Sequence, residues 1–294
     1  MKIKQSASDR VLIGFVYVVM ILAALICLYP LWLVLISSFS DPDTVALGKV
    51  LLYPMDLTLE AYVEAFKTDS ILIGYRNSLI YVIFGTIINM LLTIPTAYSL
   101  SHPKVKGKGV IMKLLVFTMY FSGGLIPLFI LNRDLGLINN IWAVLLSGAC
   151  STYNLIIARS FFMTGVPREL EEAAEIDGCS PLQTFLQIVL PLSKAMLSVI
   201  LLYYAVGRWN DYTSSLYYLP SANDLHSLQM VLRVFITRAN MAAQWGTEAA
   251  EYYERVVAQL KYSTIVIASV PLLVIYPFIQ KYFEKGVMLG SVKG

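Results

Sequence analysis

The chain has 294 residues, of which 57% belong to the hydrophobic set AVILMFWYC and only 14% are charged, and its mean hydropathy is +0.68. Soluble domains carry about 25% charged residues, so this composition excludes an ordinary soluble protein and favours a membrane protein. The net charge of +3 comes without a basic stripe, which argues against nucleic-acid binding. The three cysteines and two histidines show no metal-binding spacing, so no metal site is expected.

Six apolar segments follow one another along the chain, and each is close to the roughly 20 residues that a helix needs to cross a bilayer. The first is longer than a signal-peptide core and no A-x-A site follows it, so we read it as a retained span. Period-two alternation, the pattern of membrane β-barrels, is absent. We therefore expect an all-α membrane protein with six transmembrane helices in one domain over 1–294. The predicted spans are 11–37, 77–100, 114–131, 139–158, 192–207 and 262–279.

Lysine and arginine in the connections predict the orientation of the chain. If the N-terminus is inside, the inside segments hold 13 of the 22 Lys and Arg residues. These inside segments are 1–10, 101–113, 159–194 and 281–294. The densest basic cluster lies in the short connection 101–113, where the rule is most reliable. We therefore expect both termini inside and two long loops outside, 37–76 and 208–261.

The interiors of the six predicted spans contain no Asp, Glu, Lys, Arg or His. Ion-driven transporters usually keep such residues at membrane depth, so this argues against them, although an ion site built from backbone carbonyls stays open. The chain also lacks a G-x-x-x-x-G-K-[ST] phosphate-binding loop. If the protein drives uphill transport, a separate subunit must hydrolyse ATP, and this chain is not itself an enzyme.

The long inside connection 167–191 has the residues of two short helices joined by a turn. Pro167 suits the first position of a helix, and Gly178 suits its left-handed end. Ser180, which a proline follows, is typical of the start of a second helix, and Pro191 ends or kinks that helix. We predict either an elbow that receives force from a soluble partner or a plain interfacial amphipathic helix.

The first predicted helix places Ala173 and Ala174 on one side with Leu170 and Asp177, and small residues let a partner approach closely. The pattern Glu172-Ala173-Ala174, Asp177-Gly178, Ile188 and Leu190-Pro191 resembles the EAA loop of binding-protein-dependent ABC importers. In that family the loop forms the coupling helix, which docks on the ATPase subunit. The resemblance implies these ATPase-coupling residues: Glu172, Ala173, Ala174, Asp177, Gly178, Leu190 and Pro191.

The resemblance covers essentially the whole chain and is to carbohydrate-type permeases related to the maltose-importer subunits. The other matching segments are Tyr29-Pro30-Leu31-Trp32, Ser38-Phe39, Asn77-Ser78-Leu79, Ala97-Tyr98-Ser99-Leu100, Gly124-Leu125-Ile126-Pro127-Leu128, Arg159-Ser160-Phe161-Phe162, Trp209-Asn210-Asp211, Gln280-Lys281-Tyr282-Phe283, Lys285-Gly286-Val287 and Gly290-Ser291-Val292-Lys293-Gly294. The chain looks nearest to the branch for polysaccharide-derived oligosaccharides, including uronates from pectin or alginate. Lys194-Ala195 in place of a proline, and Cys179 and Ser291 in place of alanine, are small departures from the pattern.

This resemblance implies the ABC type I importer permease fold with a cytoplasmic coupling helix, in a bacterial inner membrane. It implies ATP-driven import of an oligosaccharide, with acidic sugars among the candidates. The implied partners are a second homologous permease subunit in a heterodimer, two ATPase subunits that bind ATP and Mg²⁺, and an extracytoplasmic sugar-binding protein. The chain itself is expected to bind no cofactor. The alternative is a stand-alone secondary carrier or channel for a small polar solute.

Sugar recognition needs hydrogen-bonding groups and aromatic rings in the spans, although such residues also serve helix packing and interface anchoring. The candidates for the substrate path are Asn89, Tyr120, Tyr153, Asn154, Tyr203, Tyr204, Trp209 and Asn210. Arg208 and Arg233 could pair with the carboxylates of an acidic sugar, but surface positions are expected for both. The Trp- and Tyr-rich loop 208–261 indicates either an interfacial aromatic belt or a platform for a ligand or partner.

Overall fold

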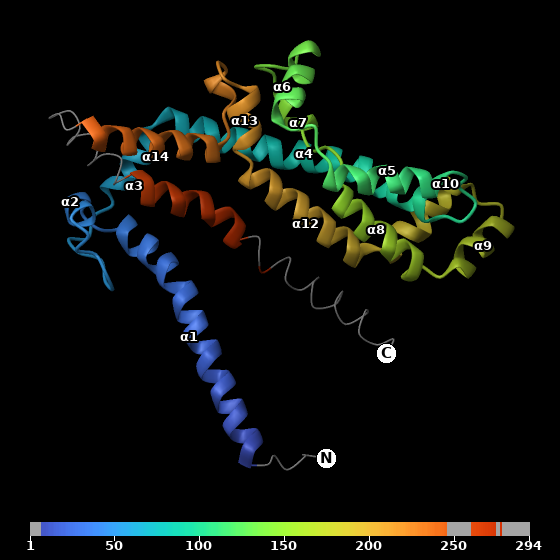
Figure 1. The fold of residues 1–294 in the computed structure, drawn as a ribbon, viewed down its shortest axis with the longest axis horizontal. Coiled ribbons are helices and arrows are strands. Elements are labelled where there is room, and N and C mark those ends of the chain that lie inside the picture. The colour runs from blue at the N-terminus through green and yellow to red at the C-terminus, as the bar shows by residue number, and fades with distance from the viewer. Residues whose placement is uncertain (1–6, 246–259, 275–276, 278–294) are drawn as a thin grey trace. The chain divides into compact units, whose positions relative to one another are not determined.

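The computed structural model describes residues 7–245, 260–274 and 277, and it is built from helices with no β-strand among these residues (Figure 1). The helices are α1 (Ala7–Ser38), α2 (Pro42–Ala46), α3 (Glu60–Lys67), α4 (Asp69–Ser101), α5 (Lys108–Tyr120), α6 (Leu125–Asp134), α7 (Ile141–Leu146), α8 (Thr152–Thr164), α9 (Arg168–Ile176), α10 (Pro181–Thr184), the π-helix η1 (Phe185–Val189), α11 (Leu190–Leu192), α12 (Lys194–Asn210), α13 (Thr213–Tyr218), the 3-10 helix η2 (Asn223–Leu225) and α14 (Leu228–Trp245). A further helix covers Leu260–Val274. The predicted all-α class is confirmed.

The chain forms two compact units. Among the described residues, the first unit contains 7–68, 232–245 and 260–269, and the second contains 69–231, 270–274 and 277. Helices α4 to α13 and the connections between them belong to the second unit, and they hold the side chains on which the functional argument rests. A single transmembrane domain over the whole chain stays a prediction.

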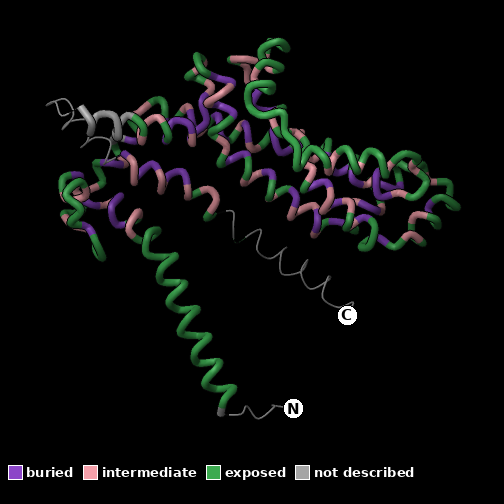
Figure 2. Tube along the Cα trace, viewed as in Figure 1, coloured by how far each residue is buried: buried purple, intermediate pink, exposed green. Residues whose placement is uncertain are grey.

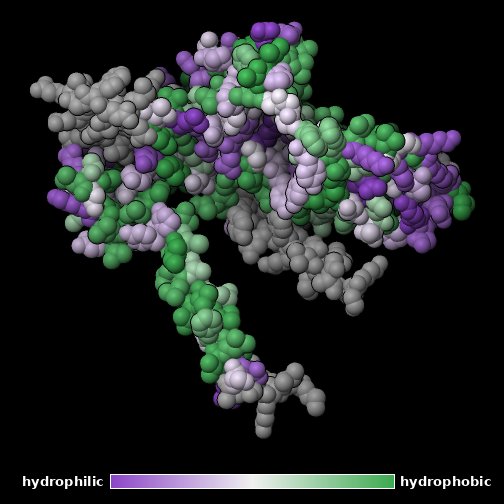
Figure 3. All heavy atoms as spheres, in the orientation of Figure 1, coloured by the Kyte–Doolittle hydropathy of each residue, from purple (hydrophilic) through white to green (hydrophobic). Residues whose placement is uncertain are grey.

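Helix α1 of the first unit is apolar on all sides, and its side chains are exposed along most of its length (Figures 2 and 3). Such a helix is stable only where lipid or another protein surrounds it. The C-terminal end of α1 is held within the first unit. The Trp32 indole N–H donates to the carbonyl of Leu52 at 2.9 Å, and the hydroxyls of Ser38 and Tyr62 hydrogen-bond at 2.7 Å.

Helix α4 is the central helix of the second unit and packs against both α8 and α12. The core between these three helices includes Ile94, Leu155 and Ile200, and the last two are fully buried. Small residues let α4 approach its neighbours closely, as at Gly74, where a Cβ would lie 3.1 Å from the Cα of Leu228. This helix therefore fixes the positions of the elements around it.

The first turns of α4 hold the segment that follows α12. The Asn77 side-chain amide donates to the carbonyls of Asp224 and His226 at 2.8 and 3.0 Å, and the Ser78 hydroxyl accepts from the Leu228 N–H at 2.9 Å. The part of the predicted loop 208–261 up to about residue 231 is thus folded onto α4 rather than free.

The described aromatic residues of that loop differ in exposure, with Tyr212 exposed and Tyr217 half-buried, so the predicted alternatives of an interfacial belt and a platform both stay predictions. Trp209 and Tyr218 are buried, and the Trp209 ring meets the edge of Tyr75 with 5.7 Å between ring centroids. Tyr252 and Tyr253 of the same loop lie outside the described residues. The buried rings therefore contribute to packing.

Two described helices, Ser8–Ser38 and Asp69–Ser101, are long and apolar enough to cross a membrane. Two bent pairs, Lys108–Tyr120 with Leu125–Asp134 and Pro181–Leu192 with Lys194–Asn210, bring the number to four if each pair is one span. The six predicted spans are therefore not all present as straight, membrane-length helices in the described residues.

The predicted continuous helix 114–131 is wrong, because α5 and α6 meet at an angle of 114°. Gly124 lies at the bend with φ +86°, a left-handed conformation that side-chain-bearing residues avoid. The fifth predicted span, 192–207, begins beside a second bend of 84° at Ser193. Both bends lie within apolar runs. Hydropathy alone does not reveal such bends.

The predicted helix 139–158 is also wrong as a single helix, because it forms α7 and α8 with residues 147–151 between them. The side chains of Asn140 and Ser151 each cap the start of one of these helices. Gly148, in the connection, has φ +63°. These local capping signals favour two short helices over one continuous helix.

Candidate functional site

The segment 167–193 forms the predicted elbow of two helical pieces and a turn. The α9 helix ends at Gly178, which has φ +83°. The Cys179 N–H donates to the Ala174 carbonyl at 2.9 Å and the Gly178 N–H to the Glu175 carbonyl at 3.2 Å, the two hydrogen bonds of a Schellman motif. The side chains and backbones of Ser180 and Gln183 form a capping box at the start of α10. The predicted helix–turn–helix is confirmed.

Two details of the elbow differ from the expectation. Pro167 is the residue before α9, so it caps the helix rather than opening it. The second piece continues from α10 through the π-helix η1 to Leu192, and the chain turns at Ser193 rather than at Pro191. A π-helical turn is a common place for a helix to bend, so the elbow has a defined corner.

The residues proposed for coupling lie mostly on the surface of the elbow. Glu172, Ala173 and Asp177 are exposed, and Leu190 is half-buried. Ala174 is the exception, because it is buried against its own chain with 4% of its surface exposed. The two alanines therefore do not share one open face. Figure 3 shows that hydrophilic residues gather at the end of the second unit where α9 and α10 lie.

Helix α9 is fastened to the C-terminal end of α4. One carboxylate oxygen of Glu171 accepts a hydrogen bond from the Tyr98 hydroxyl at 3.1 Å and lies 3.4 Å from Nε2 of His102. Arg168 donates to the carbonyl of Ser101, within the last turn of α4, at 3.2 Å. The Tyr98 ring also stacks on Phe185, with 4.9 Å between centroids. Both helical pieces of the elbow are thus tied to α4.

A further ion pair joins the elbow to the connection after α4. The Lys104 ammonium lies 2.8 Å from the Glu175 carboxylate, and both side chains are exposed. The hydrogen bond between them lowers the pKa of Glu175 and raises the pKa of Lys104. Because water screens exposed pairs, this contact contributes little to stability. The sequence reasoning did not foresee these α4 contacts, since nothing in the sequence spacing places residues 98–104 beside 168–175.

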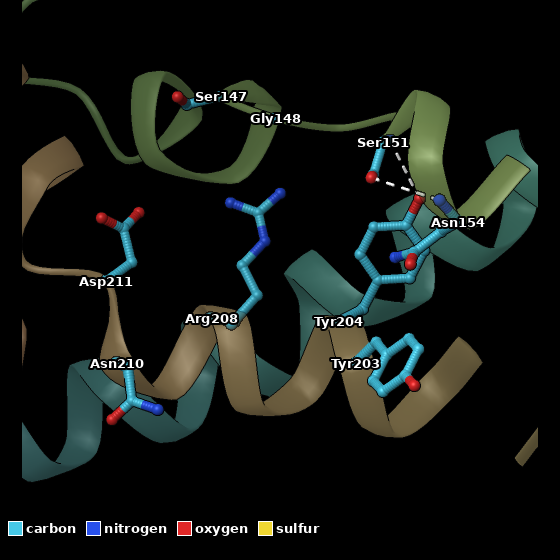
Figure 4. A pocket seen from close by; sticks show the side chains of 10 residues that line it. Ser147, Gly148, Ser151, Asn154, Tyr203, Tyr204, Arg208, Asn210 and Asp211 are labelled. Atoms are coloured by element: carbon cyan, nitrogen blue, oxygen red, sulfur yellow. Dashed lines mark hydrogen bonds between the residues drawn. The ribbon is translucent and has the colours of Figure 1, made fainter. Parts of the chain in front are cut away.

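A cavity of about 400 Å³ opens between the α7–α8 connection, α8 and α12 (Figure 4). It is lined by Ser147, Gly148, Ser151, Asn154, Tyr203, Tyr204, Gly207, Arg208, Asn210 and Asp211. Hydroxyl, amide, carboxylate and aromatic groups therefore face one space. Such a mixture can hydrogen-bond and stack against a polar ring such as a sugar.

The Tyr204 hydroxyl holds the wall of this cavity together. It hydrogen-bonds the Thr93 hydroxyl at 2.6 Å and accepts from the Ser151 N–H at 3.0 Å, so α4, α8 and α12 meet at this atom. Asn154 has 6% of its surface exposed and lines the cavity, and its side-chain amide has no hydrogen-bond partner among the described residues. Figure 4 shows that this amide projects from α8 toward the Tyr204 ring. Asn154 therefore presents its amide to the cavity.

The structure brings together part of the predicted substrate path. Asn154, Tyr203, Tyr204 and Asn210 line the cavity. Tyr120 and Tyr153 are exposed elsewhere, Trp209 is buried outside the cavity lining, and Asn89 is fully buried behind its wall. The sequence reasoning missed Ser147, Ser151 and Asp211. Ser151 caps the start of α8, and Asp211 belongs to the segment Trp209-Asn210-Asp211 that resembles carbohydrate-type permeases. Both residues therefore carried a weak local signal by which they could have been found.

The expected surface position of Arg208 is wrong. Its side chain is buried, with 7% exposed, and its guanidinium points toward the α7–α8 connection (Figure 4). The expected position of Arg233, on the exposed surface of α14, is confirmed.

The chain matches known proteins over most of its length. Residues 70–289 match the family model described as "Binding-protein-dependent transport system inner membrane component". Two similar proteins of Bacillus subtilis (strain 168) are each 38% identical: the "Polygalacturonan/rhamnogalacturonan transport system permease protein YtcP" over 99% of this chain and 100% of that one, and "Protein LplC" over 92% and 90%.

A solved structure is similar as well. The "Crystal structure of a bacterial ABC transporter involved in the import of the acidic polysaccharide alginate" contains a chain that matches with a TM-score of 0.85 and 30% identity, covering 96% of this chain and 100% of that one. The family match, the two relatives and this shared fold agree with one another. The chain therefore belongs to the family of inner membrane components of binding-protein-dependent transport systems.

Proposed function

We propose that this chain is the membrane-spanning subunit of an ABC importer that carries an oligosaccharide, with acidic oligosaccharides as the first candidates, into the cytoplasm. The observation that carries the proposal is the cavity with the unpartnered Asn154 amide, in a chain whose family moves solutes delivered by a binding protein. The names of the similar proteins support a saccharide, and the alginate importer supports an acidic one.

The proposed assembly has this chain beside a second homologous permease subunit, with six spans in each and both termini in the cytoplasm. Two ATPase subunits, which bind ATP and Mg²⁺, dock on the coupling helices. Glu172, Ala173, Asp177 and the residues around Gly178 form the docking surface of this chain. An extracytoplasmic sugar-binding protein docks on the opposite side. Closure of the ATPases rotates the spans as rigid bodies between inward- and outward-open states.

Reconstitution separates this function from a stand-alone carrier or channel. The chain is purified from its native membrane together with its bound subunits and placed in liposomes with the binding protein outside. We expect an ATPase to co-purify, and labelled oligosaccharide to enter only when ATP is enclosed, with acidic oligosaccharides stimulating ATP hydrolysis most. Uptake by the chain alone, without ATP and dependent on an ion gradient, would establish the carrier instead.

The cavity predicts a specific loss of affinity. Asn154→Ala is expected to raise the oligosaccharide concentration that half-saturates uptake by about three- to tenfold, the effect of one lost hydrogen bond. The maximal rate should change less, because the elbow is untouched. Asn132→Ala, on α6 and outside the cavity lining, is the matched control and should leave the concentration dependence unchanged. Equal behaviour of the two variants would remove Asn154 from the substrate path.

A further inference from the structure

The break between α7 and α8 leaves backbone carbonyls without helical partners. The last carbonyls of any α-helix lack an N–H four residues ahead, and those of Val144 and Leu145 are in this position in α7. The carbonyls of Gly148 and Ala149 follow in the non-helical connection. Within a membrane domain such groups must be satisfied by the protein, because lipid offers no hydrogen bonds.

Two side chains from other helices satisfy these four carbonyls. Arg208 of α12 donates from one terminal nitrogen to the Val144 carbonyl at 2.6 Å and from the other to the Leu145 carbonyl at 2.9 Å. Asn89 of α4 donates from its amide nitrogen to the carbonyls of Gly148 and Ala149, both at 2.8 Å. We call this pair of side chains, Asn89 and Arg208, the carbonyl clamp.

The two members of the carbonyl clamp are joined to each other. Nε of Arg208 donates to the side-chain oxygen of Asn89 at 3.0 Å. All three acceptors of the buried guanidinium are thus neutral oxygens, and two of them lie at the C-terminal end of a helix, where the helix dipole favours a cation. The planar fork of arginine can reach two carbonyls and Asn89 together, whereas the single ammonium of lysine cannot reproduce this arrangement.

Gly85 of α4 provides the space in which the guanidinium lies. A Cβ at this position would come within 2.8 Å of Nε and 3.1 Å of Cδ of Arg208. These atoms are in the middle of a side chain that is held at three points, so they cannot move aside without losing hydrogen bonds. An alanine at position 85 would therefore displace the carbonyl clamp.

We infer that Arg208 is a positioning residue of the transport cavity, which it serves by fixing the α7–α8 connection through its backbone carbonyls. Ser147 and Gly148 in the connection, and Ser151 and Asn154 at the start of α8, line the cavity directly beside the clamped carbonyls. If the clamp is released, this wall shifts and the Asn154 amide loses its position. The inference rests on the proposed function only in assigning the cavity to transport.

The position of the connection is measured without substrate through the native thiol of Cys150, which is exposed at its end. In the assembled importer, Cys27→Ser and Cys179→Ser leave Cys150 as the thiol to be labelled by a maleimide. Gly85→Ala is expected to change its labelling rate by about fivefold or more. Gly14→Ala, within α1 and with no atom near its added Cβ, is the matched control and should label like the parent.

Transport provides the second readout. Gly85→Ala and Arg208→Lys are both expected to raise the half-saturating oligosaccharide concentration by about fivefold or more, with a smaller effect on the maximal rate. Alanine is otherwise the better helix residue, so a harmful Gly85→Ala points to the guanidinium beneath it. If Arg208→Lys behaves like the parent, charge alone suffices and the inference is wrong.

A double substitution makes the test independent of general instability. In an Arg208→Ala background the space beside position 85 is empty, so adding Gly85→Ala should cause no further change in labelling. An equally large effect of Gly85→Ala in both backgrounds would overturn the inference, as would Gly85→Ala behaving like Gly14→Ala. If the Arg208→Ala variant does not assemble into the importer, the labelling and transport of the Gly85→Ala and Arg208→Lys variants decide whether the inference holds. If the parent fails to take up oligosaccharides, the proposed function is wrong, while the labelling still judges the clamp.

Discussion

Replacing Glu172 and Gly178 together by alanine is expected to abolish uptake and substrate-stimulated ATP hydrolysis while the chain still inserts into the membrane. Gly178 has φ +83°, where a side chain costs about 1–2 kcal/mol, so the substitution opposes the Schellman turn and changes the angle between α9 and α10. Glu172 is exposed and makes no hydrogen bond within the described chain, so its carboxylate is available to a partner. The two changes act on the shape and the chemistry of one surface.

The matched control for backbone strain lies at the end of α6. Gly136 has φ +69°, and the hydrogen bonds of Gly136 to Arg133 and of Leu137 to Asn132 form the same Schellman motif. Gly136→Ala therefore carries the same conformational cost far from α9 in the sequence. It should reduce stability by a similar amount and retain coupling. Membrane insertion, ATP hydrolysis and uptake are compared for both variants, and normal uptake by the Glu172 and Gly178 double variant would refute the coupling role.

Local signals in the sequence were sufficient for the elbow. Gly178 and Ser180 act on their own neighbours, through a left-handed turn and a capping box, so their effect can be read without knowing the rest of the fold. The same kind of signal was present where the prediction was wrong. Ser151 and Gly148 interrupt the run 139–158, but the average hydropathy of the run outweighed them.

Contacts between helices could not be predicted from the sequence. Arg208 follows the predicted span 192–207 directly, and its short distance in sequence from the aqueous loop made a surface position reasonable. Only the folded chain shows that Gly85 leaves room for the guanidinium and that the α7–α8 break provides its acceptors. A cation is tolerated there because backbone carbonyls at the end of α7 accept its hydrogen bonds. The interiors of the predicted spans contain no Asp, Glu, Lys, Arg or His, yet α12 carries the buried cation Arg208 in its last turn.

Helix α4 connects the two parts of the candidate site. Its 33 residues span about 50 Å, with Gly85 and Asn89 at the carbonyl clamp and Tyr98 at the elbow. If a force on α9 is to reach the cavity wall through α4, α9 must not slide along α4. Glu171 is one of the residues that fasten α9 to α4, because its carboxylate is bound to Tyr98 and lies beside His102.

Glu171→Ala is therefore expected to uncouple the importer. A hydrogen bond to a charged group contributes about 1.5–3 kcal/mol, so its loss should lower the number of oligosaccharides imported per ATP hydrolysed by about tenfold or more. Tyr98→Phe keeps the stacking on Phe185 and should have a smaller effect in the same direction.

Glu169→Ala is the control for this substitution, because Glu169 lies on the same helix, is exposed, and has no hydrogen bond within the described chain. Both variants remove one carboxylate from α9, so a difference between them isolates the contact with α4. The measurement is the ratio of uptake to ATP hydrolysis in liposomes with the binding protein present. If Glu171→Ala and Glu169→Ala have the same ratio, the force from the ATPase reaches the cavity by another route than the joint between α9 and α4.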